Sequence, residues 1–151
     1  MKEEFEEGVE LEIIKAAGGI VLNDEKEVLM IFRKGRWDFP KGKLYYREDE
    51  KKGAMREVIE ETGVTGLTLH SALPTTYHTY TEYNSEILKE TRWYLMRAPK
   101  SNSLKPQIEE QITEVKWVPI QEVKTLLSSS YKTLQELWNE SEKTINALLK
   151  E

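Results

Sequence analysis

One helix with two chemically different sides is predicted near the middle of this chain, between segments that are typical of strands. Asp49 suits the N-cap of this helix, and Gly63 suits its C-terminal stop. At 100° per residue, the apolar and small side chains collect on one side. These residues are Ala54, Met55, Val58, Ile59 and Thr62. Any fold built around this helix must bury that side and leave the opposite, acidic side uncovered.

The segments around the helix predict a sheet. Residues that favour strands, such as Val, Ile, Thr, Tyr and Trp, are concentrated in six of them. The predicted strands are 13–22, 28–32, 67–73, 75–83, 86–97 and 112–118. Asn23 and Asp24 supply a turn between the first two strands, whereas Pro40 and Gly42 predict that residues 37–43 form no regular element.

Two further helices are predicted at the C-terminal end. Pro119 suits the first turn of a helix that runs to about Leu127, and Ser130 suits the N-cap of the last helix. The apolar stripe of the last helix consists of Leu134, Leu137, Trp138, Ile145, Leu148 and Leu149. Its polar face is mixed in charge, which favours packing on the sheet over a membrane-surface or partner-binding role. This order of elements predicts an α/β (α+β) fold with a mixed central sheet covered by helices.

Length and composition narrow the classes of function. A chain of 151 residues without cysteine corresponds to one domain that uses no thiolate catalysis, zinc finger or iron–sulfur cluster. The net charge of −5 argues against binding a nucleic acid polymer. The apolar runs are too short for a membrane span, and the acidic start does not resemble a signal peptide. We expect a single cytoplasmic domain over residues 1–151, with its core at about 10–150, and a homodimer is compatible with the sequence.

The acidic side of the central helix carries like charges at close spacing. Glu57 and Glu61 are four residues apart, and Glu57 and Glu60 are three apart. Each such pair costs roughly 0.2–0.5 kcal/mol, and we expect no basic residue four positions away to offset them. Glu60 and Glu61 also lie near the C-terminal end, where the helix macrodipole disfavours negative charge. A divalent cation would reverse this situation, because Mg²⁺ prefers carboxylate oxygens. A merely solvated acidic face is the alternative.

The glutamates of this helix belong to a longer pattern of residues at fixed spacing. Gly42 is followed after five residues by Glu48, after seven more by Arg56-Glu57-Val58, and then after single residues by Glu60-Glu61 and Gly63-Val64. At every defined position this pattern resembles the signature of the Nudix hydrolases, which cleave a nucleoside diphosphate linked to another group. The resemblance implies an α/β/α sandwich and a metal-dependent pyrophosphohydrolase.

The same resemblance implies roles for the matching residues. The implied ligands of Mg²⁺ or Mn²⁺ are the glutamates Glu57, Glu60 and Glu61 and the carbonyl oxygen of Gly42. Glu48 is expected to support the loop or to reach the metal through water. Arg56 is expected to hold a glutamate in place, because its planar fork of donors suits a carboxylate cluster.

The general base that accepts a proton from water has three candidates. The family places this base either on the helix or in a later loop that precedes a strand ending in Trp. In this chain Glu109 and Glu110 precede the predicted strand 112–118. We expect Glu110 to be the base, with Glu109 second and Glu57 third.

The segment that precedes the helix points to a polyphosphate substrate. Residues 37–44, Trp-Asp-Phe-Pro-Lys-Gly-Lys-Leu, resemble the subgroup that acts on diadenosine polyphosphates and diphosphoinositol polyphosphates. The candidate phosphate-binding residues are Arg36, Lys41, Lys43, His78 and Lys89, and nearby Tyr or Trp rings are candidates for stacking on a base. The expected substrate is therefore a small-molecule phosphoanhydride.

Two residues near the signature are unusual. The subgroup often has Gly directly before the first signature glutamate, whereas this chain has Arg47, which predicts a stiffer or wider loop. Gly53 lies within the helix, where glycine costs about 1 kcal/mol relative to alanine, and this suggests close packing.

Two other functions stay open for this sequence. One is a MutT-like nucleoside triphosphate pyrophosphatase, and the other is a nucleotide-sensing module without catalysis.

Overall fold

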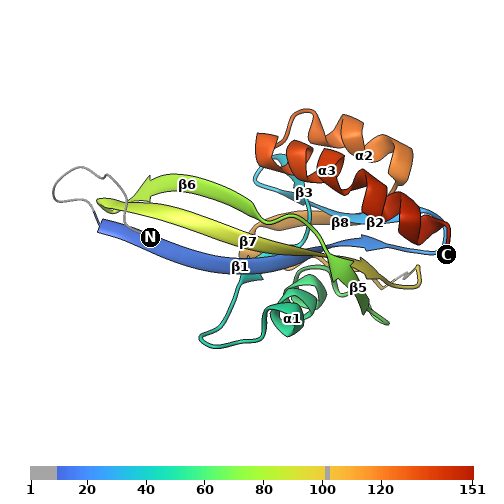
Figure 1. Cartoon of the computed structure of the whole chain (residues 1–151), viewed down its shortest axis with the longest axis horizontal. Helices are drawn as coiled ribbons and strands as arrows, with labels where there is room; N and C mark the ends of the chain where they lie inside the picture. Colours follow the sequence, from blue (N-terminus) through green and yellow to red (C-terminus); the bar gives the residue numbers. More distant parts are fainter. Residues whose placement is uncertain (1–9, 101–102) are drawn as a thin grey trace.

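A mixed sheet lies between helices in the computed structural model, which describes residues 10–100 and 103–151 (Figure 1). The helices are α1 (Glu50–Thr62), α2 (Ile120–Leu127) and α3 (Lys132–Leu149), and η1 (Ile108–Glu110) is a short 3₁₀ turn. The strands are β1 (Glu10–Leu22), β2 (Glu27–Arg33), β3 (Arg36–Asp38), β4 (Lys41–Lys43), β5 (Thr68–Ala72), β6 (Thr76–Glu82), β7 (Ser85–Arg97) and β8 (Ile112–Pro119). α1 covers one face of the sheet, and α2 and α3 cover the other. This arrangement confirms the predicted α/β/α sandwich.

The long strands β1 and β7 form the centre of the sheet. They pair in parallel along their whole length, from Glu10 opposite Ser85 to Leu22 opposite Arg97. β7 also pairs antiparallel with β5 and β6, and β2 pairs antiparallel with β1, β3 and β8. The short strand β4 pairs antiparallel with β1. Among the described strands, one parallel pair therefore combines with antiparallel pairs, and the prediction of a mixed sheet is confirmed.

Alternating side chains along the strands build a core on each face of the sheet. In β2, Val28 and Met30 join the cluster beneath α2 and α3, whereas Leu29 joins the cluster beneath α1. Each fully buried side chain of this size contributes about 1.5–3 kcal/mol to stability. The stripe of α3 lies in the first cluster, with Leu149 partly buried, so its packing on the sheet is confirmed. No helix in the ranges 10–100 and 103–151 is long and apolar enough to cross a membrane.

Two local predictions are wrong. Residues 37–43 contain β3 and β4 rather than only irregular chain, because Pro40 lies between the two strands and each needs few ladder hydrogen bonds. Ser130 does not cap α3. Its hydroxyl donates to the carbonyl oxygen of Trp37 (2.6 Å), and the N-cap is Tyr131, which makes no side-chain cap. The hydroxyl of Ser130 therefore bonds to a residue 93 positions away in the sequence instead of capping the helix.

Candidate active site

The central helix begins and ends where the sequence predicts, although its buried side is rotated. A carboxylate oxygen of Asp49 accepts the N–H of Lys52 (3.0 Å), and Gly63 ends α1 in the left-handed conformation with φ 73°. Ile59, expected in the core, is 45% exposed, whereas Glu61, expected on the acidic side, is only 5% exposed. The stripe that faces the sheet therefore includes Glu61 in place of Ile59.

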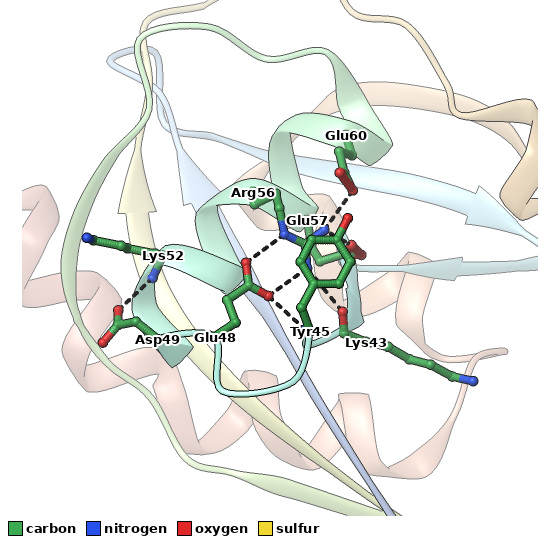
Figure 2. A network of polar contacts seen from close by, with 8 residues as sticks. All are labelled: Lys43, Tyr45, Glu48, Asp49, Lys52, Arg56, Glu57 and Glu60. Carbon is green, nitrogen blue, oxygen red and sulfur yellow. Dashed lines mark hydrogen bonds and ion pairs between the residues drawn. The ribbon is translucent and has the colours of Figure 1, made fainter.

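Arg56 ties together the acidic residues around α1 (Figure 2). Its Nη1 donates to Glu57 Oε1 (2.6 Å) and to Glu60 Oε2 (2.8 Å). Its Nε and Nη2 donate to the two carboxylate oxygens of Glu48 (2.7 and 2.9 Å), and Nη2 also donates to the carbonyl oxygen of Lys43 (3.1 Å). The expectation that no basic residue four positions away offsets the like charges is therefore wrong, because Arg56 lies four residues before Glu60 and bridges it to Glu57.

These contacts shift the pKa values of the partners in opposite directions. The hydrogen bond from Arg56 lowers the pKa of Glu48, and the bond to Glu48 holds the pKa of Arg56 above its ordinary value. Burial raises the pKa of Glu57, Arg56 lowers it and the neighbouring Glu60 raises it further, so that the net shift is upward. Glu48 is therefore a structural anion of the loop, while Glu57 is a carboxylate that a stronger cation would stabilise.

Gly42 provides the space that the Glu57 carboxylate occupies. A side chain at position 42 would overlap the carboxylate of Glu57 and would force that carboxylate to move. The backbone of Gly42 is held opposite Ala17 of β1. The structure thus brings together Gly42 and Glu57, two of the residues to which the sequence assigns a metal.

Glu61 lies beneath the start of β4. Its Oε1 accepts the backbone N–H of Lys41 (3.0 Å), and burial raises the pKa of its carboxyl to about 7. The positive charge of Lys41 opposes this rise. Near neutral pH this side chain therefore exchanges a proton readily, and a cation bound close by would drive it to the carboxylate form.

The donor set fits a divalent cation, but only part of it converges. In the described ranges, no group of three or more acidic or histidine side chains converges closely enough to hold a metal ion. Glu57 and Glu60 do converge, because both contact Nη1 of Arg56. Glu48 contacts the other two nitrogens of that guanidinium, and Glu61 accepts the N–H of Lys41. Mg²⁺ commonly takes one or two protein carboxylates and completes its shell with water and phosphate oxygens. The pair Glu57 and Glu60 suits that requirement.

The loop with the predicted general base lies next to the C-terminal end of α1. The N–H of Gln107 donates to the carbonyl oxygen of Glu61 (3.3 Å), and Arg33 Nε donates to the carbonyl oxygen of Glu110 (2.8 Å). Glu109 and Glu110 lie in and around η1, and both are exposed. In the described part of the chain neither carboxylate forms an ion pair, so the loop is close to the helix but its acids are not joined to the network of Arg56.

A basic pocket of about 370 Å³ lies on the opposite side of β4 from α1. The residues that line it include Arg33, Lys34, Asp38, Lys41, Lys43, His78, Tyr80, Lys89 and Tyr131. Lys41 and Lys43 point into this pocket, whereas Gly42 between them faces Glu57, as expected for alternation along a strand. The three residues of β4 therefore separate a cationic pocket from an anionic helix.

Charge inside the pocket is only partly compensated. Asp38 is 4% exposed and is neutralised by Lys41, whose Nζ lies 2.5 Å from Asp38 Oδ2. Lys89 forms no ion pair with any carboxylate in the described ranges, and burial lowers its pKa to about 8, assisted by the neighbouring Lys41 and Arg33. Asp38 offsets this lowering only in part, and a largely buried ammonium group without an ion pair in the described ranges favours an anionic ligand.

Aromatic side chains line the mouth of this pocket. His78 lies opposite Lys89 in the pairing of β6 with β7, and its ring is stacked on that of Tyr80 with centroids 5.6 Å apart. Tyr131 approaches from the start of α3 (6.3 Å from His78), and the guanidinium of Arg36 lies over its ring at 4.6 Å. Arg36 thus borders the pocket through Tyr131. The sequence gives no local signal for Tyr131, because it joins the pocket only through folding.

Comparisons with known proteins agree with this arrangement. The model of the NUDIX domain family matches residues 13–137. The chain is 32% identical over 124 residues to MutT4 of Mycobacterium tuberculosis, which covers 75% of this chain and 49% of that protein. It is 28% identical over 119 residues to the m7GpppN-mRNA hydrolase dcap-2 of Caenorhabditis elegans, covering 72% of this chain and 14% of that protein. The chain spans half or less of the length of these two relatives.

Solved structures share the fold. An Ap4A hydrolase of C. elegans, solved as a binary complex, superimposes with a TM-score of 0.67 at 21% identity and covers 89% of this chain and 98% of its own. A MutT protein from Methanosarcina mazei Go1 gives a TM-score of 0.66 at 19% identity and covers 95% of this chain and 99% of its own. At this identity the two structures establish the architecture alone.

Proposed function

Because the NUDIX family model matches most of its length, the chain belongs to the Nudix family, and we propose that it is a metal-dependent pyrophosphohydrolase. Its substrate would be a nucleoside diphosphate linked to another group, in particular a dinucleoside polyphosphate or an inositol polyphosphate. We further propose that one domain spans residues 1–151 and acts in the cytoplasm on a small molecule. A homodimer, which the sequence leaves open, gains no support from the comparisons and forms no part of this proposal.

One observation carries the proposal, the position of β4 between two opposite charges. On one side, Gly42 contacts Glu57 of the acidic helix, and on the other, Lys41 and Lys43 enter the basic pocket. A phosphoanhydride needs both environments, because its oxygens require cationic partners while its cleavage requires an activated water. Because β4 contributes residues to both environments, we infer that a single polyphosphate reaches both.

The acidic side would hold the metal. The residues that would bind Mg²⁺ or Mn²⁺ are Glu57 and Glu60, with Glu61, Glu48 and the carbonyl oxygen of Gly42 as further candidates. When bound, such an ion neutralises phosphate oxygens and lowers the pKa of water. Arg56 orients Glu57 and Glu60 through its shared nitrogen, and this orientation limits the reorganisation that catalysis requires.

A carboxylate would then accept the proton of the attacking water. As the oxygen of water forms its bond to phosphorus, the bridging P–O bond breaks and the leaving phosphate takes its electron pair. We assign the proton to Glu110, with Glu109 and then Glu57 as alternatives. The exposed position of Glu110 beside the end of α1 supports this order, because its backbone is anchored by Arg33 while its side chain is free of ion pairs in the described residues.

The basic pocket would bind the remaining phosphates. Lys41, Lys43 and Lys89 supply cationic groups, and His78 and Arg36 lie at its aromatic border. The rings of Tyr80 and Tyr131 offer surfaces on which a base can stack. The Ap4A hydrolase with the same fold is consistent with a substrate of this class.

Product chromatography tests the proposal. The protein is incubated with Mg²⁺ or Mn²⁺ and diadenosine tetraphosphate, a diphosphoinositol polyphosphate, the four nucleoside triphosphates, ADP-ribose or a nucleotide sugar. We expect metal-dependent cleavage of a polyphosphate and no cleavage in EDTA. Preferred cleavage of nucleoside triphosphates would instead favour a MutT-like enzyme. Calorimetric binding of a nucleotide with no product after hours would favour a sensing module and contradict the proposal.

A further inference from the structure

Tyr45 covers the guanidinium group of Arg56, although the signature assigns this position no role. The Cζ atom of Arg56 lies 3.8 Å from the centroid of the Tyr45 ring, and Figure 2 shows the ring in front of the polar network. The side chain is 61% exposed, so burial of apolar surface alone does not explain its place. An aromatic face at this distance attracts a guanidinium group through cation–π interaction and stacking.

The ring restricts the one motion of Arg56 that its hydrogen bonds leave open. All bonds of the guanidinium lie along its N–H directions, to Glu48, to the carbonyl oxygen of Lys43, and through Nη1 to Glu57 and Glu60. These bonds resist displacement within the guanidinium plane. Displacement perpendicular to the plane is opposed by a ring packed on its face.

Backbone contacts hold the ring in this position. The N–H of Tyr45 donates to Glu48 Oε1 (3.0 Å), and the N–H of Glu48 donates to the carbonyl oxygen of Tyr45 (3.0 Å). The N–H of Leu44 donates to the carbonyl oxygen of Lys15 in β1 (2.9 Å). Gly53 makes room for this loop, since a side chain there would overlap Leu44 and press on Glu48. The loop is therefore anchored to the sheet, to itself and to α1.

The neighbouring tyrosine offers a matched comparison. Tyr46 is 87% exposed, and its ring is contacted by Arg47, whose Cζ lies 5.1 Å from the centroid. In the described residues Tyr46 has no contact of this kind with Arg56. Two adjacent tyrosines in one loop thus differ in whether they touch the arginine that joins the carboxylates.

We propose that Tyr45 is a positioning residue that acts through Arg56 on Glu57 and Glu60 and thereby raises the affinity of this carboxylate pair for a divalent cation. Without the ring, the guanidinium group can move out of the plane of its hydrogen bonds. The two carboxylates then lose the shared donor that keeps them close despite their mutual repulsion. This inference rests on the proposed metal-dependent function.

Mn²⁺ binding to the whole chain tests the inference without an activity assay. Free Mn²⁺ is quantified by electron paramagnetic resonance for wild type, Tyr45→Ala, Tyr45→Phe and Tyr46→Ala, well below the unfolding temperature of each. We expect the Kd of Tyr45→Ala to rise about threefold to tenfold, in line with a lost cation–π contact. Tyr45→Phe keeps the ring and should match wild type, and Tyr46→Ala should match it too.

The outcomes separate this inference from the function on which it rests. If wild type binds Mn²⁺ and Tyr45→Ala binds it equally well, or if Tyr46→Ala is impaired to the same degree, the positioning role is wrong while the proposed function stands. A merely structural role would lower the Tm of Tyr45→Ala and leave its Kd unchanged. If wild type binds no Mn²⁺ at all, the proposed metal-dependent function itself is overturned.

Discussion

Charge is balanced differently on the two sides of β4. On the side of α1, Glu48, Glu57 and Glu60 all contact the guanidinium of Arg56, so the acidic cluster carries its own cation. On the side of the pocket, Lys89 is largely buried and forms no ion pair in the described ranges. On the first side the charges are paired within the chain, whereas on the second side Lys89 would be neutralised by an anionic ligand. A polyphosphate that spans β4 would complete both.

From this contrast we infer that the two sides have separate roles, one in holding the metal and the other in binding phosphate. In the proposed function, the carboxylate pair would hold the metal for the chemical step, because a fixed geometry favours reaction. The uncompensated cations favour binding of phosphate oxygens, because a buried ammonium group is stabilised by a bound anion. The predictions below test this contrast, beginning with the largest expected effect.

Removal of a carboxylate from the helix should weaken metal binding most. Glu57→Gln keeps the shape of the side chain that Gly42 accommodates but removes the charge. We expect the Kd for Mn²⁺ to rise about 100-fold, near the upper end of what altered metal sites show. Calorimetric titration with Mn²⁺ measures this change. Glu122→Gln, an exposed acid in the first turn of α2, is the control and should bind like wild type. Equal affinity of both variants would contradict the assignment.

Removal of the buried ammonium should weaken binding of phosphate rather than of metal. Lys89→Met in EDTA is expected to bind inorganic tripolyphosphate about tenfold more weakly than wild type, as for a lost charged hydrogen bond. Since the pKa of Lys89 is lowered to about 8, the wild-type affinity should also fall as the pH rises above 8, and the variant should lack this dependence. Fluorescence titration measures both effects, with Lys143→Met on the exposed face of α3 as control. An unchanged affinity would place the phosphates elsewhere.

The buried carboxyl of Glu61 should make stability depend on pH. Its pKa is about 7 in the folded chain against 4.5 for the ordinary group, so between these pH values the native state binds more protons than the unfolded state. Stability therefore decreases as the pH rises from 5 to 8. Denaturation by urea in EDTA should show that wild type loses stability relative to Glu61→Gln over this range. A difference between the two proteins that is independent of pH would show that Glu61 is not buried as described.

The smallest effect concerns the loop that closes the acidic side. Arg47 has φ 60°, a left-handed conformation that favours glycine, and glycine is the residue common at this position in the subgroup that the sequence resembles. Arg47→Gly should raise the unfolding free energy by about 1 kcal/mol and leave the Kd for Mn²⁺ unchanged. Thermal and urea denaturation measure the stability. A loss of stability would mean that the stacking of Arg47 on Tyr46 outweighs the backbone strain.

The sequence predicts the elements better than it predicts the contacts between them. The caps Asp49 and Gly63 act through neighbouring residues, so local pattern suffices to place α1. Glu61 escapes such a prediction, because a helical wheel shows which residues share a side but not which side meets β4. Arg47 adopts a left-handed conformation, and the close packing predicted at Gly53 is explained by its contact with Leu44 of the loop.

The remaining differences between predicted and observed contacts involve side chains that are distant in sequence and meet only in the fold. Tyr131 and Arg36 are far apart in sequence and meet because the segment that joins α2 to α3 lies against β3. The same is true of Ser130, whose hydroxyl bonds to Trp37 instead of capping α3. Sequence spacing places Arg56 four residues before Glu60, but it does not show that the same guanidinium also contacts Glu48, because that contact depends on the loop before α1.

Steady-state kinetics on diadenosine tetraphosphate with Mg²⁺ test the central claim most directly, with wild type, Glu57→Gln and Lys89→Met measured in parallel. The division across β4 predicts that Glu57→Gln lowers kcat and raises the Mg²⁺ concentration required, with KM little changed, whereas Lys89→Met raises KM and leaves the Mg²⁺ requirement unchanged. Turnover in EDTA, or a Glu57→Gln variant with the kcat of wild type, would contradict the account.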